Sequence, residues 1–524
     1  MGLIRSLITI SGNTVISRIL GFMRDRLVYS VLGLSPMADA FSVSVKAPAL
    51  FRRLFAEGAF NAAFVPTFSG VYSDKSVHDA KVFAEQAFTL LFVGLLGLVI
   101  LVELFMPQFI GLVAGGFKSK PEALQYAIEY TRITFPYILF ISLTALLGAV
   151  LNSMDKFGAA AATQIIANVV VISYFVLFYE SAETPGHAAA WGSVLSGFIQ
   201  LIWLHWVCTR QSGLKIGFRK PTITPEMQQM FKLFVPGLIG SGIVQLNLFM
   251  NMAIGSRLHT GGLAALHIAD RVNQLPLSLI GVAMGTALLP LLYRQLKAGE
   301  IKEALNTQNR ALELTLLLTF PAAVTLMIYA DSFIATLFMD KNFELSDVMK
   351  TAPALVAYST GLPAYVFLKV VSASFFAHKD TKTPMYVAGA CFFLNAILSA
   401  FAILMFNHIE MGHVGIAASL SISSWINVFA LAWIAYRRNM LKLDRGFYRT
   451  TVLGLIACAI MGIVIYVIEP IFQSYMFYEP IYIKIATLIG LIFIGIITFF
   501  IPAYFMGILK VQDIKVHALG RGSQ

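Results

Sequence analysis

Ionisable side chains lie inside several long apolar segments of this sequence, where they need a special environment. A charge at the centre of a bilayer costs at least about 2.5–3.5 kcal/mol, so such a residue faces water, pairs with another charge or reaches towards the interface. Cations outnumber carboxylates in these segments, which predicts an anionic ligand. The residues are, segment by segment, Arg18, Arg24, Asp25 and Arg26; Asp39, Lys46, Arg52, Arg53 and Glu57; Asp270 and Arg271; and Lys369.

Arg24, Arg52 and Arg271 are the strongest candidates for a water-filled cavity. None of the three has an opposite charge three or four residues away on the same helical face. A guanidinium group presents a planar fork of donors that matches phosphate oxygens, which a lysine point charge does not. We therefore expect these three arginines to converge on one central cavity.

Other ionisable residues have a plain structural interpretation. Arg53 and Glu57 are four residues apart and so share a helical face, which favours a simple ion pair. Lys46 and Lys369 fit a ligand contact and a solvated cavity wall equally well. Asp270 fits a salt bridge to an arginine of the first half. The weaker candidates for the cavity or its gate are Asp25, Asp39, Lys46, Glu57, Asp270 and Lys369, although Asp39 and Arg26 could simply reach interfacial water at the ends of their segments.

No pattern of a metal centre or of nucleotide hydrolysis is present. The three cysteines (Cys208, Cys391 and Cys458) lack metal-ligand spacing, and the histidines form no HExxH or HxH set. A P-loop is also missing, which argues against direct ATP hydrolysis. We therefore expect no metal, no cofactor and no enzymatic activity.

The composition places these residues in a membrane protein. The 524 residues are 58% hydrophobic and only 12% charged, whereas a soluble domain usually has about 25% charged residues. The net charge of +11 is spread over short loops without a continuous basic face, so nucleic acid is not expected as a partner. The first thirty residues include Arg18, Arg24 and Arg26 and no small-residue cleavage site, which predicts no removable signal peptide.

The apolar segments are long enough to be membrane-spanning helices and lack the alternation of a β-barrel. The sequence predicts an all-α polytopic protein of about fourteen spans. They are 8–32, 38–71, 83–112, 126–150, 159–180, 187–209, 228–256, 262–293, 310–337, 351–376, 384–406, 414–436, 450–468 and 482–508.

The loop charges predict the orientation of these spans. Cytoplasmic loops are enriched in Lys and Arg. Most loop cations lie on the side of the N-terminus, which predicts that both termini are cytoplasmic. The opposite loops hold only Lys118, Lys120, Arg257, Lys341 and Lys350.

The chain also repeats itself with a shift of about 227 residues. This shift places Pro136 on Pro363, Asn168 on Asn395 and Trp206 on Trp433. Six spans separate matching positions, so the two halves have the same orientation, a plan that places transporter sites between the halves. We expect lobes at 1–225 and 226–445, followed by two further helices at 446–524.

Several motifs resemble the MurJ (MviN) family of lipid II flippases, part of a superfamily with multidrug exporters and polysaccharide-unit flippases. They are SRILGFMRDRLV (17–28), ADAF (38–41), FRRLFAEGAFNAAFVP (51–66), TRITFPYILFISL (131–143), ADRVNQLP (269–276) and GVAMGTALLP (281–290). The resemblance implies two six-helix lobes in an inner-membrane protein of peptidoglycan biosynthesis. It also implies that the essential cavity arginines are Arg18, Arg24, Arg52, Arg53 and Arg271, and that the last two helices form a groove for the polyprenyl tail.

The expected substrate is lipid II, an undecaprenyl-diphosphate-linked disaccharide-pentapeptide, moved by alternating access of a monomer among membrane lipids. Coupling to the membrane potential or to a monovalent ion stays open. One alternative is a multidrug exporter, which would be expected to place carboxylates in its cavity. Another is a flippase for a different polyprenyl-diphosphate-linked glycan, which the arginines do not distinguish from lipid II. A membrane enzyme would need a clustered acid, base or metal set.

Overall fold

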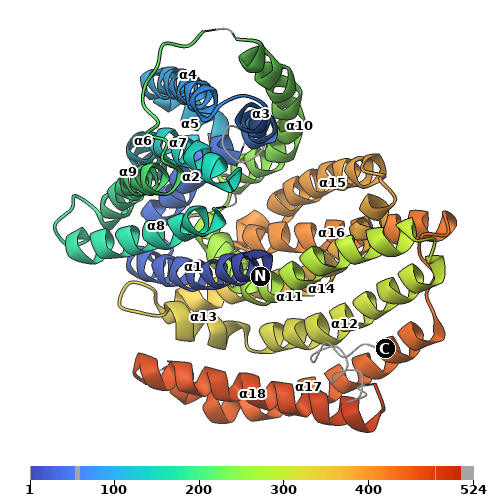
Figure 1. The fold of residues 1–524 in the computed structure, drawn as a ribbon. Helices are drawn as coiled ribbons and strands as arrows, with labels where there is room; N and C mark the ends of the chain where they lie inside the picture. Colours follow the sequence, from blue (N-terminus) through green and yellow to red (C-terminus); the bar gives the residue numbers. More distant parts are fainter. Residues whose placement is uncertain (1, 54–58, 155, 223, 478, 509–524) are drawn as a thin grey trace. The chain divides into compact units, whose positions relative to one another are not determined.

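The computed structural model describes residues 2–53, 59–154, 156–222, 224–477 and 479–508, and these ranges are almost entirely helical. The only β-pairing within them is an isolated bridge between Asp340 and Phe343. This confirms the predicted all-α class. The chain divides into two compact units, Met1–Ala264 and Ala265–Gln524 (Figure 1).

The first unit pairs helices that are close in the chain as well as helices that are distant in it. α1 packs against α8, α2 against α6, α9 against both α7 and α8, and α10 against α3. The helices are α1 (Gly2–Leu32), α2 (Pro36–Arg52), α3 (Ala59–Asp74), α4 (Val77–Leu104), α5 (Met106–Val113), η2 (Gly115–Ser119), α6 (Pro121–Thr134), α7 (Tyr137–Asn152), α8 (Phe157–Phe178), α9 (Pro185–Ser212) and α10 (Pro225–Gly255); α11 (Gly262–Lys297) begins here and continues into the second unit.

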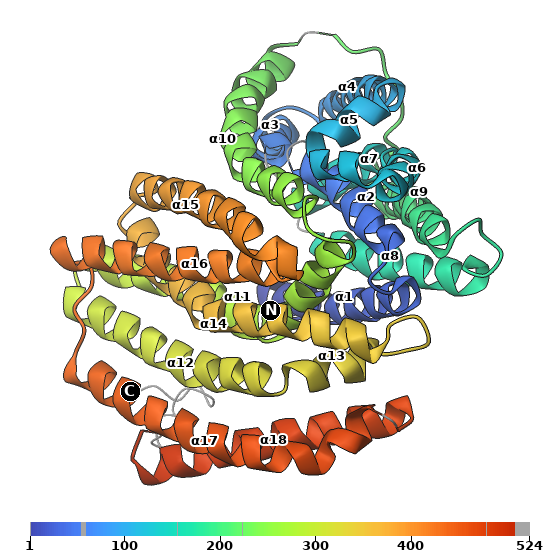
Figure 2. The same ribbon diagram turned by 180° about the vertical axis from the view of Figure 1, so that it is seen from behind.

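The second unit is built around α14, which packs against α12 and α16, while α15 packs on α16 (Figure 2). α17 and α18 lie side by side along one edge of this unit, with α17 against α12. The remaining helices are α12 (Ile301–Ile328), α13 (Ala330–Phe338), α14 (Leu345–Ala377), α15 (Lys382–Phe406), η3 (Asn407–Ile409), α16 (Gly412–Arg437), α17 (Arg445–Phe477) and α18 (Ile481–Phe505).

Ten helical segments in the described residues are long and apolar enough to cross a membrane. The four expected spans outside this set are 8–32, 38–71, 228–256 and 262–293, and three of them contain most of the intramembrane charges. Because charge lowers the hydropathy of a segment, a span that lines an aqueous path is the hardest to detect by composition. The total of fourteen spans stays a prediction.

Several expected spans are not single continuous helices. The expected span 83–112 comprises the end of α4, at Leu104, and α5, which begins at Met106. Within the expected span 38–71 the structure describes α2 and α3, and residues 54–58 lie outside the described residues. The expected span 126–150 is interrupted at Phe135 and Pro136, because proline lacks the N–H that would continue the hydrogen-bond ladder. Hydropathy alone detects the apolar run but not the break within it.

Three helices begin with the same local chemistry. Ser35, Thr184 and Thr224 each accept a hydrogen bond on the side-chain oxygen from a backbone N–H in the first turn. The next residue is proline in each case, which suits the first helical position because its missing N–H would have no partner there. α9 ends at Ser212 and is capped by Gly213, whose φ of 73° favours glycine.

The order of helices repeats within the chain. Val77–Leu104 and Met106–Val113 of the first unit recur as Ile301–Ile328 and Ala330–Phe338 in the second, a shift of 224 residues from 77 to 301 and from 106 to 330. The pairing of α8 with α9 likewise recurs as α15 with α16. These elements agree with the predicted repeat, whereas the relative orientation of the two halves stays a prediction.

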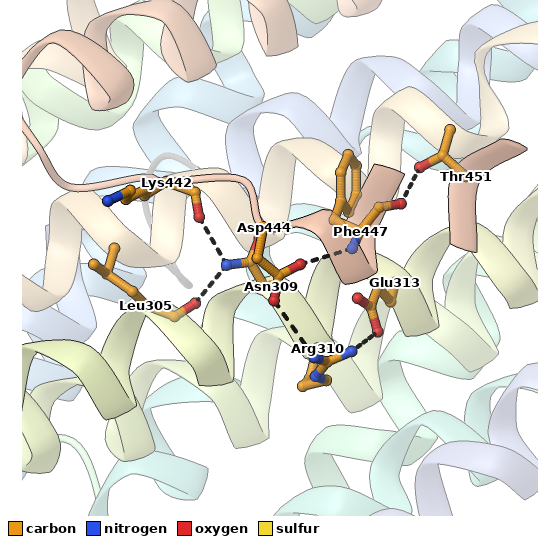
Figure 3. A network of polar contacts seen from close by, with 8 residues as sticks. All are labelled: Leu305, Asn309, Arg310, Glu313, Lys442, Asp444, Phe447 and Thr451. Carbon is orange, nitrogen blue, oxygen red and sulfur yellow. Dashed lines mark hydrogen bonds and ion pairs between the residues drawn. The ribbon is translucent and has the colours of Figure 1, made fainter. Parts of the chain in front are cut away.

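A polar network fixes the segment before α17 to α12 (Figure 3). Asn309 Nδ2 donates to the Lys442 carbonyl oxygen at 2.8 Å, and Arg310 pairs with both Glu313 and Asp444. Asp444 Oδ1 also accepts from the Phe447 N–H at 2.7 Å and so caps the start of α17. This network attaches the first turn of α17 to α12 within the second unit.

Asp380, between α14 and α15, gives a prediction about pH. Hydrogen bonds from the Thr383 hydroxyl and backbone N–H, with the nearby Arg438 guanidinium, lower the pKa of Asp380 to about 2. Because the pKa of Asp380 in the folded protein is below its unfolded value of 3.8, the ionised carboxyl group stabilises the folded protein above pH 3.8. This stabilisation is lost as the pH falls through about 2. We expect Asp380→Asn to lower the thermal midpoint clearly at pH 7 and much less at pH 2, where the carboxyl group is only partly ionised. An equal deficit at both values would contradict this.

Candidate cationic site

Arg24 of α1 forms a local ion pair that the sequence did not indicate. Its Nη2 and Nε lie 2.7 and 2.9 Å from Asp25 Oδ1. Arg24 has no opposite charge three or four residues away, as the sequence indicated, but its long side chain folds back onto the adjacent residue, Asp25.

Asn168 of α8 holds the same arginine from the other side. Its Oδ1 accepts from Arg24 Nη1 at 3.2 Å, and its Nδ2 donates to the Ser17 carbonyl oxygen at 3.0 Å. The carboxamide thus bridges α1 and α8 while orienting the guanidinium. Three of the five guanidinium N–H groups are engaged by these two partners, which leaves donors to spare for an anion.

Arg52 lines a cavity of about 230 Å³ within the first unit. Arg52 is the last residue of α2, and the other lining residues of the cavity come from α3, α7, α8 and α9. Among the described residues that line the cavity, none is acidic. Its polar side chains are Arg52, Asn61, Thr144, Asn152, Thr163 and Gln164. One fixed positive charge among neutral hydrogen-bonding groups suits an anionic, polar ligand.

The remaining first-half candidates are spread over α1 and α2. Arg18 and Arg53 are exposed, and Lys46 is half-buried. Glu57 lies outside the described residues, so the expected Arg53–Glu57 pair stays a prediction.

Asp39 is buried at the start of α2 and does not reach interfacial water. Its two carboxylate oxygens accept from the Gly261 and Ala264 backbone N–H groups at 2.8 and 2.9 Å. These N–H groups are at the beginning of α11, where the helix dipole favours a negative charge. Lys120 Nζ donates to the Leu258 carbonyl oxygen of the same turn. Asp39 therefore fixes the turn between α10 and α11 to α2.

The second unit holds the other three candidates. Asp270 and Arg271 are half-buried on α11, and Asp270 Oδ2 accepts from Gln274 Nε2 at 2.6 Å. Lys369 is exposed on α14, and its Nζ lies 2.6 Å from the position that a Cβ at Gly281 would take. The first unit contains Arg24 and Arg52, so their convergence with Arg271 stays a prediction, as does a salt bridge from Asp270 to a first-half arginine.

The sequence search missed the neutral members of this site. It considered only charges, and so passed over Asn61, Asn152 and Gln164 beside Arg52. Asn168 did carry a signal, since the repeat places it on Asn395. A carboxamide beside an intramembrane arginine orients the guanidinium group without neutralising its charge.

Comparison with known proteins decides the family. A family model described as "Lipid II flippase MurJ" matches residues 28–487. The probable lipid II flippase MurJ of Rhizobium tropici is 38% identical, with 98% of this chain and 96% of the relative covered. The chain belongs to the MurJ lipid II flippase family.

Further similarities agree with the MurJ assignment. The lipid II flippase MurJ of Burkholderia cenocepacia is 31% identical over 86% of this chain and 87% of the relative. A solved MurJ in an inward closed conformation superposes with a TM-score of 0.75 at 25% identity, covering 98% of this chain and all of the other. A multidrug resistance transporter of the MATE family, of the MOP superfamily, matches at a TM-score of 0.66 and 15% identity, with 83% and 98% covered, and shares the fold.

Proposed function

We propose that this chain flips lipid II from the cytoplasmic to the outer leaflet of the inner membrane. The proposal rests on membership of the MurJ family together with the Arg52 cavity. In that cavity a guanidinium lies beside carboxamides and hydroxyls, and no described lining residue is acidic. This is the chemistry needed for a diphosphate joined to a polar head group.

The mechanism follows from the cost of moving that head group. Each polar group that enters hydrocarbon without a partner costs several kcal/mol. A hydrated cationic path would receive the diphosphate and head group, while the polyprenyl tail stays in lipid. We infer that the two lobes rock against each other and open the cationic path first to the cytoplasm and then outward, as in other parallel-repeat transporters. Arg18, Arg24, Arg52, Arg53 and Arg271 are the proposed ligands of the diphosphate.

The direction of lipid II transport requires no chemical reaction. Outward movement of the diphosphate carries negative charge, which a negative-inside potential favours by about 2.3 kcal/mol per charge per 100 mV. The membrane potential could therefore drive transport, with or without a monovalent ion. We propose that the chain works as a monomer, that it is not an enzyme and that both termini are cytoplasmic. We also propose that the polyprenyl tail lies along α17 and α18, whose exposed side chains are largely apolar.

The charge of the cavity distinguishes one of the two rival functions from lipid II flipping. An exporter of cationic drugs would be expected to have carboxylates beside its ligand, whereas the Arg52 cavity has a cation and neutral groups. A flippase for another polyprenyl-diphosphate-linked glycan has the same phosphate chemistry, and membership of the MurJ family favours lipid II over it.

Reconstitution tests the proposal directly. Purified full-length protein is placed in liposomes with fluorescent lipid II, and the fraction accessible to an external quencher is followed over time. We expect exchange between leaflets to be faster than in liposomes without protein, and an inside-negative potential to bias it outward. Exchange no faster than in protein-free liposomes would contradict the proposal.

Gly281 offers a way to test Lys369. A Cβ on Gly281 would lie 2.6 Å from Lys369 Nζ, so Gly281→Ala must displace the ammonium group. Because the displaced atom is the flexible end of a side chain, we expect little change in thermal midpoint. If Lys369 lines the path, flipping should fall several-fold, as in Lys369→Met, and the double variant should be no worse than either. Full flipping in Gly281→Ala would remove Lys369 from the path.

A further inference from the structure

The Arg52 cavity contains more hydrogen-bonding capacity than a diphosphate alone requires. Asn152 and Gln164 are exposed carboxamides, each with donors and an acceptor, on α7 and α8. Asn61 Oδ1 is buried and accepts no hydrogen bond from the residues that the structure describes. Amides that both donate and accept suit hydroxyl and acetamido groups, which also do both, better than they suit phosphate, which only accepts.

The hydroxyls of the cavity fit the same chemistry. Thr144 and Thr163 donate to the carbonyl oxygens of Phe140 and Ala160 in their own helices, at 2.8 and 2.7 Å. Their donors are therefore engaged, and the oxygens keep a lone pair that can accept. The cavity thus offers acceptors for ligand O–H and N–H groups in addition to the Arg52 charge.

The volume limits what can enter. The cavity measures about 230 Å³. A cavity of about 150 Å³ is known to hold benzene. The Arg52 cavity is therefore large enough for one substituted six-membered ring, and too small for a disaccharide with a peptide.

We propose that the Arg52 cavity binds the one sugar that is attached directly to the diphosphate. Arg52 binds the adjoining phosphate, while Asn152 and Gln164 hydrogen-bond to the substituents of the sugar ring. The rest of the head group lies outside the cavity. The inference rests on the proposed function, and it makes Asn152 and Gln164 specificity-determining residues for the first sugar.

The test compares three ligands on the full chain in nanodiscs of zwitterionic lipid. A fluorescent lipid II analogue is displaced by a short-chain polyprenyl diphosphate, by the same lipid carrying one sugar, or by phosphatidylglycerol. We expect the one-sugar lipid to bind about tenfold tighter than the bare diphosphate, the contribution of one or two good hydrogen bonds. Phosphatidylglycerol should compete poorly, and equal competition would assign the cavity to a general anionic head group and overturn the proposal.

Variants locate the preference in the cavity. We expect Asn152→Leu with Gln164→Leu to reduce the tenfold preference to about twofold or less, while affinity for the bare diphosphate stays the same. Gln125→Leu is the matched control, because Gln125 is an exposed carboxamide on α6 of the same unit, bonded only to Glu129 in the described contacts. It should keep the full preference. A preference that survives in the double variant would overturn the proposal.

A substitution that fills part of the cavity tests the proposal without removing any hydrogen-bonding group. A Cβ on Gly148 would make ordinary contacts with Ala160 and Leu204 at 3.4 and 3.8 Å, so a small side chain is accommodated there. Gly148→Ala should weaken binding of the one-sugar lipid selectively, because the added methyl group occupies part of the cavity. Failure of the wild-type chain to bind any polyprenyl diphosphate would refute the proposed function, whereas equal binding with and without the sugar would refute only this inference.

Discussion

Replacement of Arg52 by alanine should reduce lipid II flipping at least about 100-fold and abolish support of growth. Arg52 supplies the one positive charge among the described lining residues of its cavity. Two charge-assisted hydrogen bonds to phosphate contribute about 1.5–3 kcal/mol each, and each 1.36 kcal/mol corresponds to a factor of ten in rate. Flipping is measured in liposomes, and growth in cells with the variant as sole copy.

Arg52→Lys separates charge from geometry. An ammonium group keeps the charge but not the planar pair of donors, so we expect it to be impaired as well, although less than alanine. The control is abundance in the membrane, because a degraded variant reports nothing about binding. Normal growth with lysine would show that charge suffices, and wild-type turnover with alanine would exclude Arg52 from the site.

Asp39→Leu should have the largest effect on stability. The substitution leaves the Gly261 and Ala264 N–H groups without the carboxylate that now accepts from both. Hydrogen bonds to a charged acceptor contribute roughly 1.5–3 kcal/mol each, so we expect the loss of two to cost about 3–6 kcal/mol. Thermal denaturation in detergent, at constant protein and lipid concentration, measures it as a fall of several degrees.

Asp39→Asn separates the two contributions of this carboxylate. The amide keeps one acceptor oxygen but loses the charge at the start of α11, so the fall should be about half as large. Asp74→Asn is the control, because Asp74 is exposed in the same unit and accepts only from Ser73 in the described contacts. A denaturation midpoint for Asp39→Leu equal to that of the control would exclude the capping role.

The helical class and the repeat could be predicted because they depend on patterns that run along the chain. Apolar length and sparse charge dictate helices in lipid. The breaks between helices could not be predicted in the same way. Pro136 lies between α6 and α7, whereas Pro363, its counterpart in the repeat, lies inside the continuous helix α14. Whether a proline breaks a helix depends on the packing around it, which no local pattern contains.

The candidate site was predictable only in its charged members. Intramembrane arginines are conspicuous because they are costly, whereas Asn61 and Gln164 are ordinary residues until the fold places them beside Arg52. Asp39 was visible as a charge, but its role depends on Gly261 and Ala264, more than 200 residues away in the chain. Contacts of that kind require the tertiary structure.

The leaflet distribution of lipid II in cells tests the central claim most directly. A strain depleted of its own flippase is supplied with this chain, and an externally added colicin that cleaves lipid II reports the fraction in the outer leaflet. We expect this chain to restore cleavage, whereas Arg52→Ala at equal membrane abundance should not. Lipid II that stays protected in the presence of the wild-type chain would contradict it.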